Sequence, residues 1–426
     1  MTNKLENFFR SYTKEDLYYI MVAIYASTII FNDFSKYFLW FFGIIFLIFY
    51  SKIHLYRSKV IWGIFLPLAL HVLFFWNNES YLQAIKELEK FTVFLVFPIL
   101  FIFQRSSINL KKTLTYYSSI FSTIILLFFI YYLYVNFIDF KGFISGKDVW
   151  KMGYEFSNFV GSHAPAFNMQ VSFLSFVNLY LATNMILSKS KNSFLLIRLF
   201  FLASSLFVML IINTRLAISI FAVGSISYLV YAFSVKRLSA KKIFFISVFF
   251  GVISTVFLLM FPSTLEKFKN KTFNQLDMIG KLDQIEKPEE KIYGSLVTRL
   301  TVWSVVLKMS AKKPIIGYGY TNCYPLLFQE YKDSNQHFLL KHSYRVHNQF
   351  LDYLLKFGLS GIIFLTIFFT NKFYVALKIR SAVFLYFCVI FLAANLFDNF
   401  LIKYEGIAFC AFWTSLFIRS YIEKEE

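Results

Sequence analysis

Two long apolar runs stand almost end to end at residues 195–234, which read LLIRLFFLASSLFVMLIINTRLAISIFAVGSISYLVYAFS. A helix needs about 20 mostly apolar residues to cross the hydrocarbon core of a membrane. We therefore predict one transmembrane helix at 195–213 and another at 216–234. The polar step Asn213-Thr214-Arg215 between them leaves almost no loop, so it marks a membrane boundary.

The same length criterion, applied outward from this stretch, predicts an all-α polytopic membrane protein with about twelve transmembrane helices. The fourth span is short and contains Pro98, so we expect it to be tilted or kinked. The twelve expected spans are 17–31, 37–50, 60–76, 91–103, 114–138, 166–187, 195–213, 216–234, 243–262, 347–370, 382–398 and 404–420.

The composition excludes most soluble classes. Of 426 residues, 58% are hydrophobic, 22% are aromatic and only 16% are charged, whereas a soluble domain carries about 25% charged residues. A disordered chain is excluded for the same reason. The three cysteines, Cys323, Cys388 and Cys410, have no zinc-type spacing and predict neither a disulfide framework nor a metal site.

The net charge of +19 is explained largely by membrane sidedness rather than by nucleic-acid binding. Positive residues precede the first span without a convincing cleavage site after it, so we expect this segment to remain as an anchor. With this end inside, the positive-inside rule places both termini in the cytoplasm. The basic connections on that side are Lys52/Arg57/Lys59, Arg105/Lys111/Lys112, Lys189/Lys191/Arg198, Lys236/Arg237/Lys241/Lys242 and Lys372/Lys378/Arg380.

Two outer connections, 139–165 and 263–346, are too long to be turns. Long loops in compact proteins are often functional, so we divide the chain into an N-terminal bundle (1–262), a large periplasmic loop (263–346) and C-terminal helices (347–426). The loop has a charged part at 273–291. Its part at 297–313 predicts an amphipathic helix near the membrane surface, with Leu300, Trp303 and Leu307 at helical spacing.

Two arginines are candidates for binding an anion on the outer side. Arg215 lies at the expected membrane boundary, where it either reaches the lipid headgroups or binds a ligand. Arg299 and Trp303 are spaced i, i+4 and share a helix face; a surface arginine stacked on the indole is the plainer alternative. Arginine is well shaped for bidentate contact with phosphate.

His347 and Asp398 are further candidates on the same side. A histidine can accept a proton from a hydroxyl near neutral pH, although a lone histidine at an interface is often structural. Asp398 and Glu405 lie at helix ends, where carboxylates are usually solvated. Asp352 and Lys356, spaced i, i+4, are expected to pair or to face a polar cavity.

These residues resemble the bacterial O-antigen ligase and polymerase superfamily over about 65 positions. The family pattern is an arginine and tryptophan, a Pro-x-x-Gly-x-Gly turn and a His-Asn that opens a helix ending in Gly-x-x-Gly. It corresponds here to Arg299-x-x-x-Trp303, Pro314-Ile315-Ile316-Gly317-Tyr318-Gly319, His347-Asn348 and Gly358-Leu359-Ser360-Gly361. Asn213-Thr214-Arg215 resembles the family's membrane-boundary arginine, with threonine in place of the usual serine.

The resemblance implies an inverting transferase that needs no metal or other cofactor and moves glycan from undecaprenyl diphosphate to a sugar hydroxyl of lipid A-core. It also implies an inner-membrane protein with a site facing the periplasm, and no nucleic-acid partner. Arg215 and Arg299 would bind the diphosphate and His347 would deprotonate the acceptor. Trp303, Asn348 and Asp398 would contribute to substrate binding, and Asp398 would alternatively orient His347.

Three alternatives remain on the sequence. A repeat-unit polymerase or a protein O-oligosaccharyltransferase would use the same motifs and donor type. A lipid-linked glycan flippase would also have about twelve spans, but it should show inverted repeats or charges lining a central path.

Overall fold

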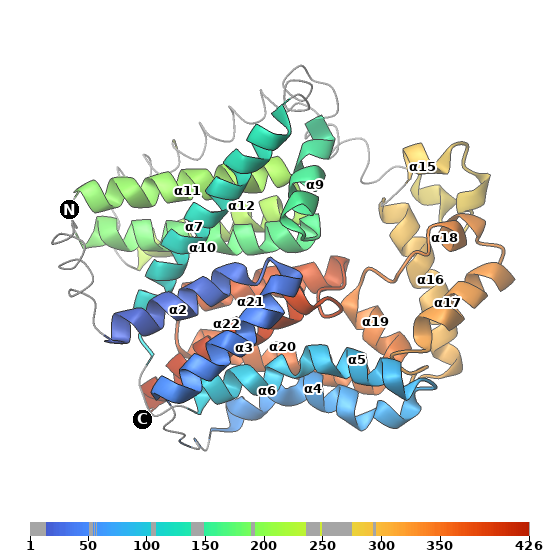
Figure 1. Ribbon diagram of the computed structural model, residues 1–426. Coiled ribbons are helices and arrows are strands. Elements are labelled where there is room, and N and C mark those ends of the chain that lie inside the picture. The colour runs from blue at the N-terminus through green and yellow to red at the C-terminus, as the bar shows by residue number, and fades with distance from the viewer. Residues whose placement is uncertain are drawn as a thin grey trace.

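The protein is described by a computed structural model that covers residues 14–50, 54, 56, 58–103, 108–137, 149–188, 192–235, 248, 275–292 and 295–425. Within these ranges helices are the only regular secondary structure and no strand occurs. Figure 1 shows the helices packed side by side in a bundle, with a smaller group at one end. The predicted all-α class is therefore confirmed.

The N-terminal half contains long helices joined by short turns. They are α2 (Lys14–Thr28), α3 (Asn32–Tyr50), η1 (Lys59–Ile61), α4 (Trp62–Leu73), η2 (Phe75–Asn77), α5 (Tyr81–Phe91), α6 (Val93–Phe97), η3 (Pro98–Ile102), α7 (Leu110–Val135), α9 (Val149–Val160), α10 (Ala164–Leu187), α11 (Asn192–Ile212) and α12 (Arg215–Ser234).

The C-terminal half begins with short elements and ends with long helices. They are η4 (Leu276–Met278), η5 (Leu282–Gln284), α15 (Pro288–Lys291), α16 (Leu296–Lys312), α17 (Cys323–Asp333), α18 (His337–Lys341), α19 (Gln349–Phe357), α20 (Leu359–Lys378), α21 (Ala382–Phe397) and α22 (Tyr404–Glu425).

Five helices in the described ranges are long and apolar enough to cross a membrane: α7, α10, α11, α12 and α20. The count of about twelve stays a prediction, since the ninth expected span, 243–262, lies outside the described residues apart from position 248. In the fourth expected span, Pro98 begins the π-helical turn η3 directly after the five-residue α6. That segment is therefore irregular, as its proline predicts.

The tenth expected span, 347–370, was wrong as a single helix. The chain breaks between α19 and α20 at Gly358, whose φ of 64° and ψ of −153° lie in a region open essentially to glycine alone. A Cβ at this position would also collide with the backbone of Ile315. Hydropathy extends across the break because both segments are apolar, so the length criterion misses it.

The bundle is centred on α10, which contacts α7, α9, α11, α12 and α21. Aromatic rings fill the space between the helices: the Trp413 ring lies 4.7 Å from that of Tyr117 and 4.9 Å from that of Phe173, both edge to face. Such pairs contribute about 0.5–1.5 kcal/mol each beyond area burial. The high aromatic content is therefore used for packing in the interior of the bundle.

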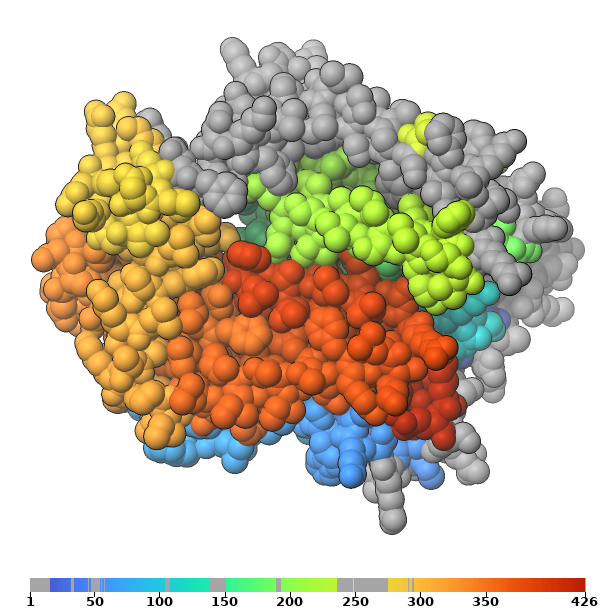
Figure 2. Space-filling view, turned by 180° about the vertical axis from the view of Figure 1, so that it is seen from behind, coloured from blue at the N-terminus to red at the C-terminus, as the bar shows by residue number. Residues whose placement is uncertain are grey.

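Residues 275–346 form a helical unit with a hydrophobic core of its own. Val297, Val302 and Val306 of α16 pack with Leu327 and Leu339 from α17 and α18. Figure 2 shows this unit, yellow to orange, at one end of the molecule beside the C-terminal helices. The predicted helix at 297–313 is present as α16.

The helix α16 has a second apolar face besides the expected one. Its buried side is made of the valines, whereas Leu307 is 51% exposed and Leu300 is only partly buried. The sequence carries two apolar stripes at helical spacing, and the branched valines are the ones that pack inside the unit. Leu307 and its neighbours remain on the outside.

Candidate functional site

A helix–turn–helix break positions Arg215 at one end of the bundle. Asn213 adopts the left-handed conformation, with φ 55°, and so ends α11. Thr214 follows in an extended conformation, and α12 begins at Arg215. The Asn168 amide donates to the Thr214 hydroxyl at 2.7 Å and ties this break to the first turns of α10. Arg215 is therefore the first residue of α12 and lies at the end of the bundle where α10 also begins.

Arg299 and Trp303 lie one helical turn apart on α16, as predicted. Trp303 does not serve merely as a surface for the arginine, because its Nε1 donates to the carbonyl oxygen of Val346 at 2.8 Å. Arg299 and Arg215 are close enough to repel each other electrostatically. Two cations held near each other favour an anion between or beside them.

His347 is held in an unusual backbone conformation directly before α19. Its φ is 49°, in the left-handed region, which a non-glycine residue rarely adopts. The next residue, Asn348, is the N-cap: its side-chain oxygen accepts from the amides of Phe350 and Leu351. Its Nδ2 donates to the carbonyl of Leu396 at 2.9 Å. Both ends of the Asn348 amide are thus used to hold the helix start, and with it the histidine.

Asp398 follows the last residue of α21 and meets His347 across 51 residues of sequence. Its Oδ1 lies 3.0 Å from His347 Nδ1, and the two side chains are 17% and 34% exposed, respectively. Burial by itself raises the pKa of Asp398, but the hydrogen bond and charge of His347 bring it below its usual range. Since a carboxylate can only accept, Nδ1 carries a proton, and in the neutral imidazole Nε2 then has the lone pair.

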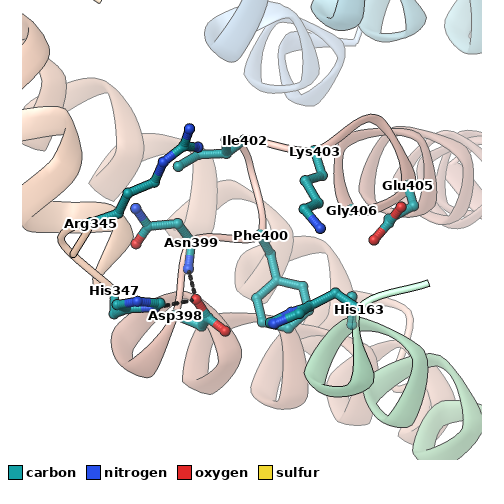
Figure 3. Close-up of a pocket in the computed structure, with 11 residues that line it drawn as sticks. His163, Arg345, His347, Asp398, Asn399, Phe400, Ile402, Lys403, Glu405 and Gly406 are labelled. Atoms are coloured by element: carbon teal, nitrogen blue, oxygen red, sulfur yellow. Dashed lines mark hydrogen bonds and ion pairs between the residues drawn. The ribbon is translucent and has the colours of Figure 1, made fainter. Parts of the chain in front are cut away.

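The pair lies in a cavity of about 360 Å³. Figure 3 shows Arg345 and Lys403 along one side and His347, Asp398 and His163 along the other. Glu405 also lines it, while Arg215, Arg299, Trp303 and Asn348 do not. The structure therefore places two of the six predicted site residues in the cavity and the other four outside its lining.

Three basic residues of this cavity were missed by the sequence analysis: His163, Arg345 and Lys403. Each stands in a connection between helices and belongs to no recognisable motif. Arg345 lies two positions before His347, which was the only available signal for it. Burial lowers the pKa of His163, with Asp398 opposing this effect and Lys403 adding to it. His163 is therefore neutral near pH 7.

A buried ion pair lies within α19, the helix that follows His347 and Asn348. Lys356 Nζ lies 2.7 Å from Asp352 Oδ2, and the two side chains are almost fully enclosed. The Tyr324 hydroxyl of α17 donates to Asp352 Oδ1 at 2.5 Å. Burial alone lowers the pKa of Lys356, but Asp352 more than offsets this and raises it. The predicted pairing of Asp352 with Lys356 is confirmed.

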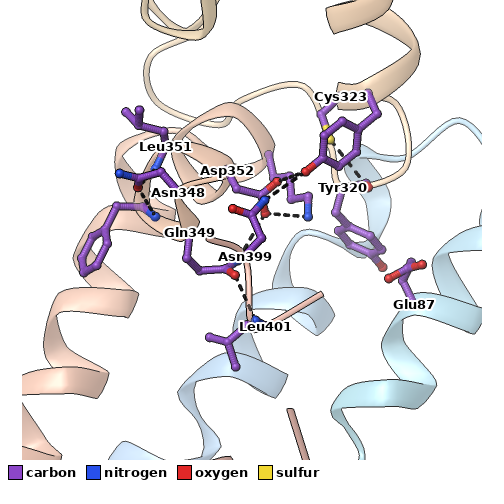
Figure 4. Close-up of polar contacts among 12 residues, drawn as sticks. Glu87, Tyr320, Cys323, Asn348, Gln349, Leu351, Asp352, Asn399 and Leu401 are labelled. Carbon is purple, nitrogen blue, oxygen red and sulfur yellow. Dashed lines mark hydrogen bonds and ion pairs between the residues drawn. The ribbon is translucent and has the colours of Figure 1, made fainter. Parts of the chain in front are cut away.

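The same cluster holds the loop that carries Asp398. Gln349 of α19 accepts a hydrogen bond from the amide of Leu401 at 3.0 Å. Asn399 donates to the Tyr324 hydroxyl at 3.3 Å. Figure 4 shows these contacts converging on α19 from α17 and from the loop between α21 and α22. The position of Asp398 therefore depends on α19 and α17 as well as on its own helix.

The glycines of the 314–319 segment shape a turn, as expected. Gly319 has a φ of 82°, and a Cβ there would collide with the carbonyl of Asn77. The amides of Tyr318 and Gly319 donate to the carbonyls of Leu355 and Lys356, each at 2.9 Å. The turn thus satisfies the last carbonyls of α19 and connects the helical unit to it.

The model of a family described as O-antigen ligase matches residues 176–366 of this chain. The matched range includes Arg215, Arg299, Trp303 and His347, and it ends before Asp398. A search of the curated proteins finds no significant match.

Proposed function

We propose that this chain is an O-antigen ligase, because the model of the O-antigen ligase family matches residues 176–366. It would move a finished glycan from undecaprenyl diphosphate to a sugar hydroxyl of lipid A-core at the periplasmic face of the inner membrane. The pair His347–Asp398 in the cavity carries this proposal, since it supplies a base whose Nε2 is available to a substrate hydroxyl.

The proposed transfer is a single displacement. The acceptor hydroxyl gives its proton to Nε2 of His347 as its oxygen attacks the anomeric carbon of the donor. The bond from that carbon to the diphosphate oxygen breaks, and its electron pair leaves with undecaprenyl diphosphate. Configuration at the anomeric carbon is inverted. Asp398 stabilises the imidazolium that forms, through the hydrogen bond at Nδ1.

Arg215 and Arg299 are proposed to bind the diphosphate. Their mutual repulsion in the protein alone would be relieved by a bound dianion. The charge on the leaving oxygen increases as the sugar bond breaks, and fixed cations beside it lower that barrier. An activated glycosyl diphosphate supplies the driving force, so the proposed chemistry requires no nucleotide or metal.

Carrier-linked glycan and lipopolysaccharide from a strain lacking the protein, both analysed on gels with the same glycan probe, test this function. A ligase predicts long glycan on the carrier and bare lipid A-core. Cores that bear a single repeat would instead indicate a polymerase. A normal core with an unglycosylated protein target would indicate a protein O-oligosaccharyltransferase, and glycan trapped on the cytoplasmic side a flippase.

A point variant separates catalysis from transport. His347→Ala should abolish product while carrier-linked donor still reaches the periplasm. His342→Ala is the matched control, because His342 lies in the same helical unit beside Glu289 and outside the cavity lining. A flippase would tolerate the His347 change, so normal product formation in His347→Ala would refute the transferase proposal.

A further inference from the structure

Two cations in the cavity are not used by the proposed transfer. Arg345 and Lys403 come from different segments, 344–348 and the loop between α21 and α22, and both line the cavity beside His347. We propose that they form an acceptor subsite for an anionic saccharide, one that carries a phosphate group near the attacking hydroxyl. This inference rests on the proposed function and assigns the chemistry of its acceptor.

The position of Arg345 follows from the packing of its neighbours. Tyr344 and Val346 are buried in the core of the helical unit, so the residues between and after them, Arg345 and His347, are turned toward the cavity. The guanidinium carbon of Arg345 lies 5.0 Å from the centroid of the Tyr324 ring. The same tyrosine bonds Asp352. Arg345 is thus held over a fixed ring while its donors remain exposed.

Lys403 lies on the same side of the cavity as Arg345 but comes from a different segment. It is exposed at the end of the loop that begins with Asp398, and Figure 3 shows its ammonium directed into the cavity toward His163. Within the described ranges, neither Lys403 nor Arg345 has a side-chain hydrogen bond or ion pair. Two carboxylates line the cavity: Asp398, which His347 engages, and Glu405, whose side chain is buried. The exposed charged side chains of the lining, Arg345 and Lys403, are both positive.

The location favours the acceptor over the donor diphosphate. Arg215 and Arg299, the proposed diphosphate ligands, do not line the cavity, whereas His347 does. A hydroxyl that gives its proton to Nε2 must enter the cavity, and groups a sugar ring away from that hydroxyl then come within reach of Arg345 and Lys403. A phosphate there would take charge-assisted bonds from both. Because both cations are exposed, added salt should weaken this attraction.

The test measures transfer to two acceptors with the full-length protein in membranes. The probes are lipid A-core and the same lipid A-core after chemical dephosphorylation. For Arg345→Gln and Lys403→Gln we expect the KM for the native acceptor to rise about tenfold each, with little change in kcat. With the dephosphorylated acceptor, the variants should match the unchanged protein. Arg345→Lys should restore most of the loss.

Controls identify each way of failing. Lys341→Gln removes an exposed cation of the same helical unit that pairs with Glu289 and should change neither KM. An equal rise in KM for both acceptors in the Arg345 and Lys403 variants, or no rise for either acceptor, would overturn the subsite. If the change in KM depends on acidic sugars in the donor glycan and not on the acceptor phosphate, the assignment of the subsite to the acceptor is overturned. Failure of the unchanged protein to transfer to either acceptor would refute the proposed function itself.

Discussion

The indole nitrogen of Trp303 and the carbonyl oxygen of Val346 are joined by a 2.8 Å hydrogen bond across 43 residues of sequence. This bond fixes α16 to the short segment that presents Arg345 and His347. The helix face that carries Arg299 is therefore held at a constant distance from the segment that carries the proposed base. The tryptophan one turn after Arg299 thus positions the neighbouring segment through this hydrogen bond.

Trp303→Phe removes this bond and keeps most of the ring. We expect a loss of roughly 1 kcal/mol in stability and a lower kcat, because the carbonyl of Val346 loses its donor and the segment before His347 is held less firmly. Donor binding, measured as retention of carrier-linked glycan by the purified protein, should change little. A variant with normal kcat would show that the bond does not position the histidine.

His347→Gln tests the proposed base while it retains polarity and size. Glutamine cannot take a proton from the acceptor, so we expect transfer to fall by about 10²- to 10⁴-fold. The KM for the donor should change little. The rate of product formation under saturating donor is the measurement, and a normal melting temperature in detergent is the control for folding.

Asp398→Asn tests the hydrogen bond at His347 Nδ1. The pKa of Asp398 lies below its ordinary value of 3.8, so the carboxylate stays charged at every pH above about 4 and its titration does not shape the activity profile there. Removal of this charge makes the imidazole bind its proton less readily. We therefore expect a lower rate, and an acidic limb of the pH–rate profile displaced to lower pH. An unmoved limb would indicate that Asp398 does not act through His347.

Arg299→Gln and Arg299→Lys separate charge from geometry at the proposed diphosphate site. Loss of the charge should reduce transfer by roughly 10²- to 10³-fold. Lysine should restore only part of this, since it cannot make the bidentate contact of a guanidinium. Arg215→Gln and Arg215→Lys should have the same effects as the corresponding changes at Arg299. Full activity of both lysine variants would refute bidentate binding. Lys312→Gln, which removes a cation at the other end of α16, is the matched control.

Asp352→Asn tests the buried pair behind the site. The change leaves the Lys356 ammonium enclosed without its carboxylate, and we expect a loss of about 3–5 kcal/mol in stability. The double variant Asp352→Asn with Lys356→Met should recover much of this loss, because it removes the unpaired charge. Thermal unfolding in detergent, followed by tryptophan fluorescence, compares the two. Equal destabilisation in both variants would contradict the pairing argument.

The sequence predicts the membrane helices best where hydropathy and length decide the outcome. The runs at 195–213 and 216–234 correspond to α11 and α12, and the polar residues between them do start a helix at Arg215. The same criterion fails at Gly358, because it measures apolarity and is blind to a backbone conformation that only glycine adopts. The sequence analysis recognised the glycine motif at this position. The helix break, however, results from the backbone dihedral angles of Gly358, about which hydropathy gives no information.

The site was predictable only as far as single residues carry chemistry. His347 and Asp398 were both expected on one side of the membrane, but their contact joins two distant segments. It depends on the bonds that hold the loop after Asp398, from Leu401 to Gln349 and from Asn399 to Tyr324. His163, Arg345 and Lys403 have no motif that announces them. Their roles arise from the fold, which brings three connections to one cavity.

The nine residues of α19 have a consequence for how substrates reach this cavity. One end of the helix is bonded to α21 through Asn348 and to the following loop through Gln349, and the other end is bonded to the turn at 317–319. Its middle holds α17 through Asp352. A movement of α17 away from the bundle would break a buried charged contact, so this part of the helical unit is held in place and does not open. The proposed glycan substrates would then enter and leave past side chains that keep their positions, and access would be limited by the shape of the passage instead of by the opening of a lid.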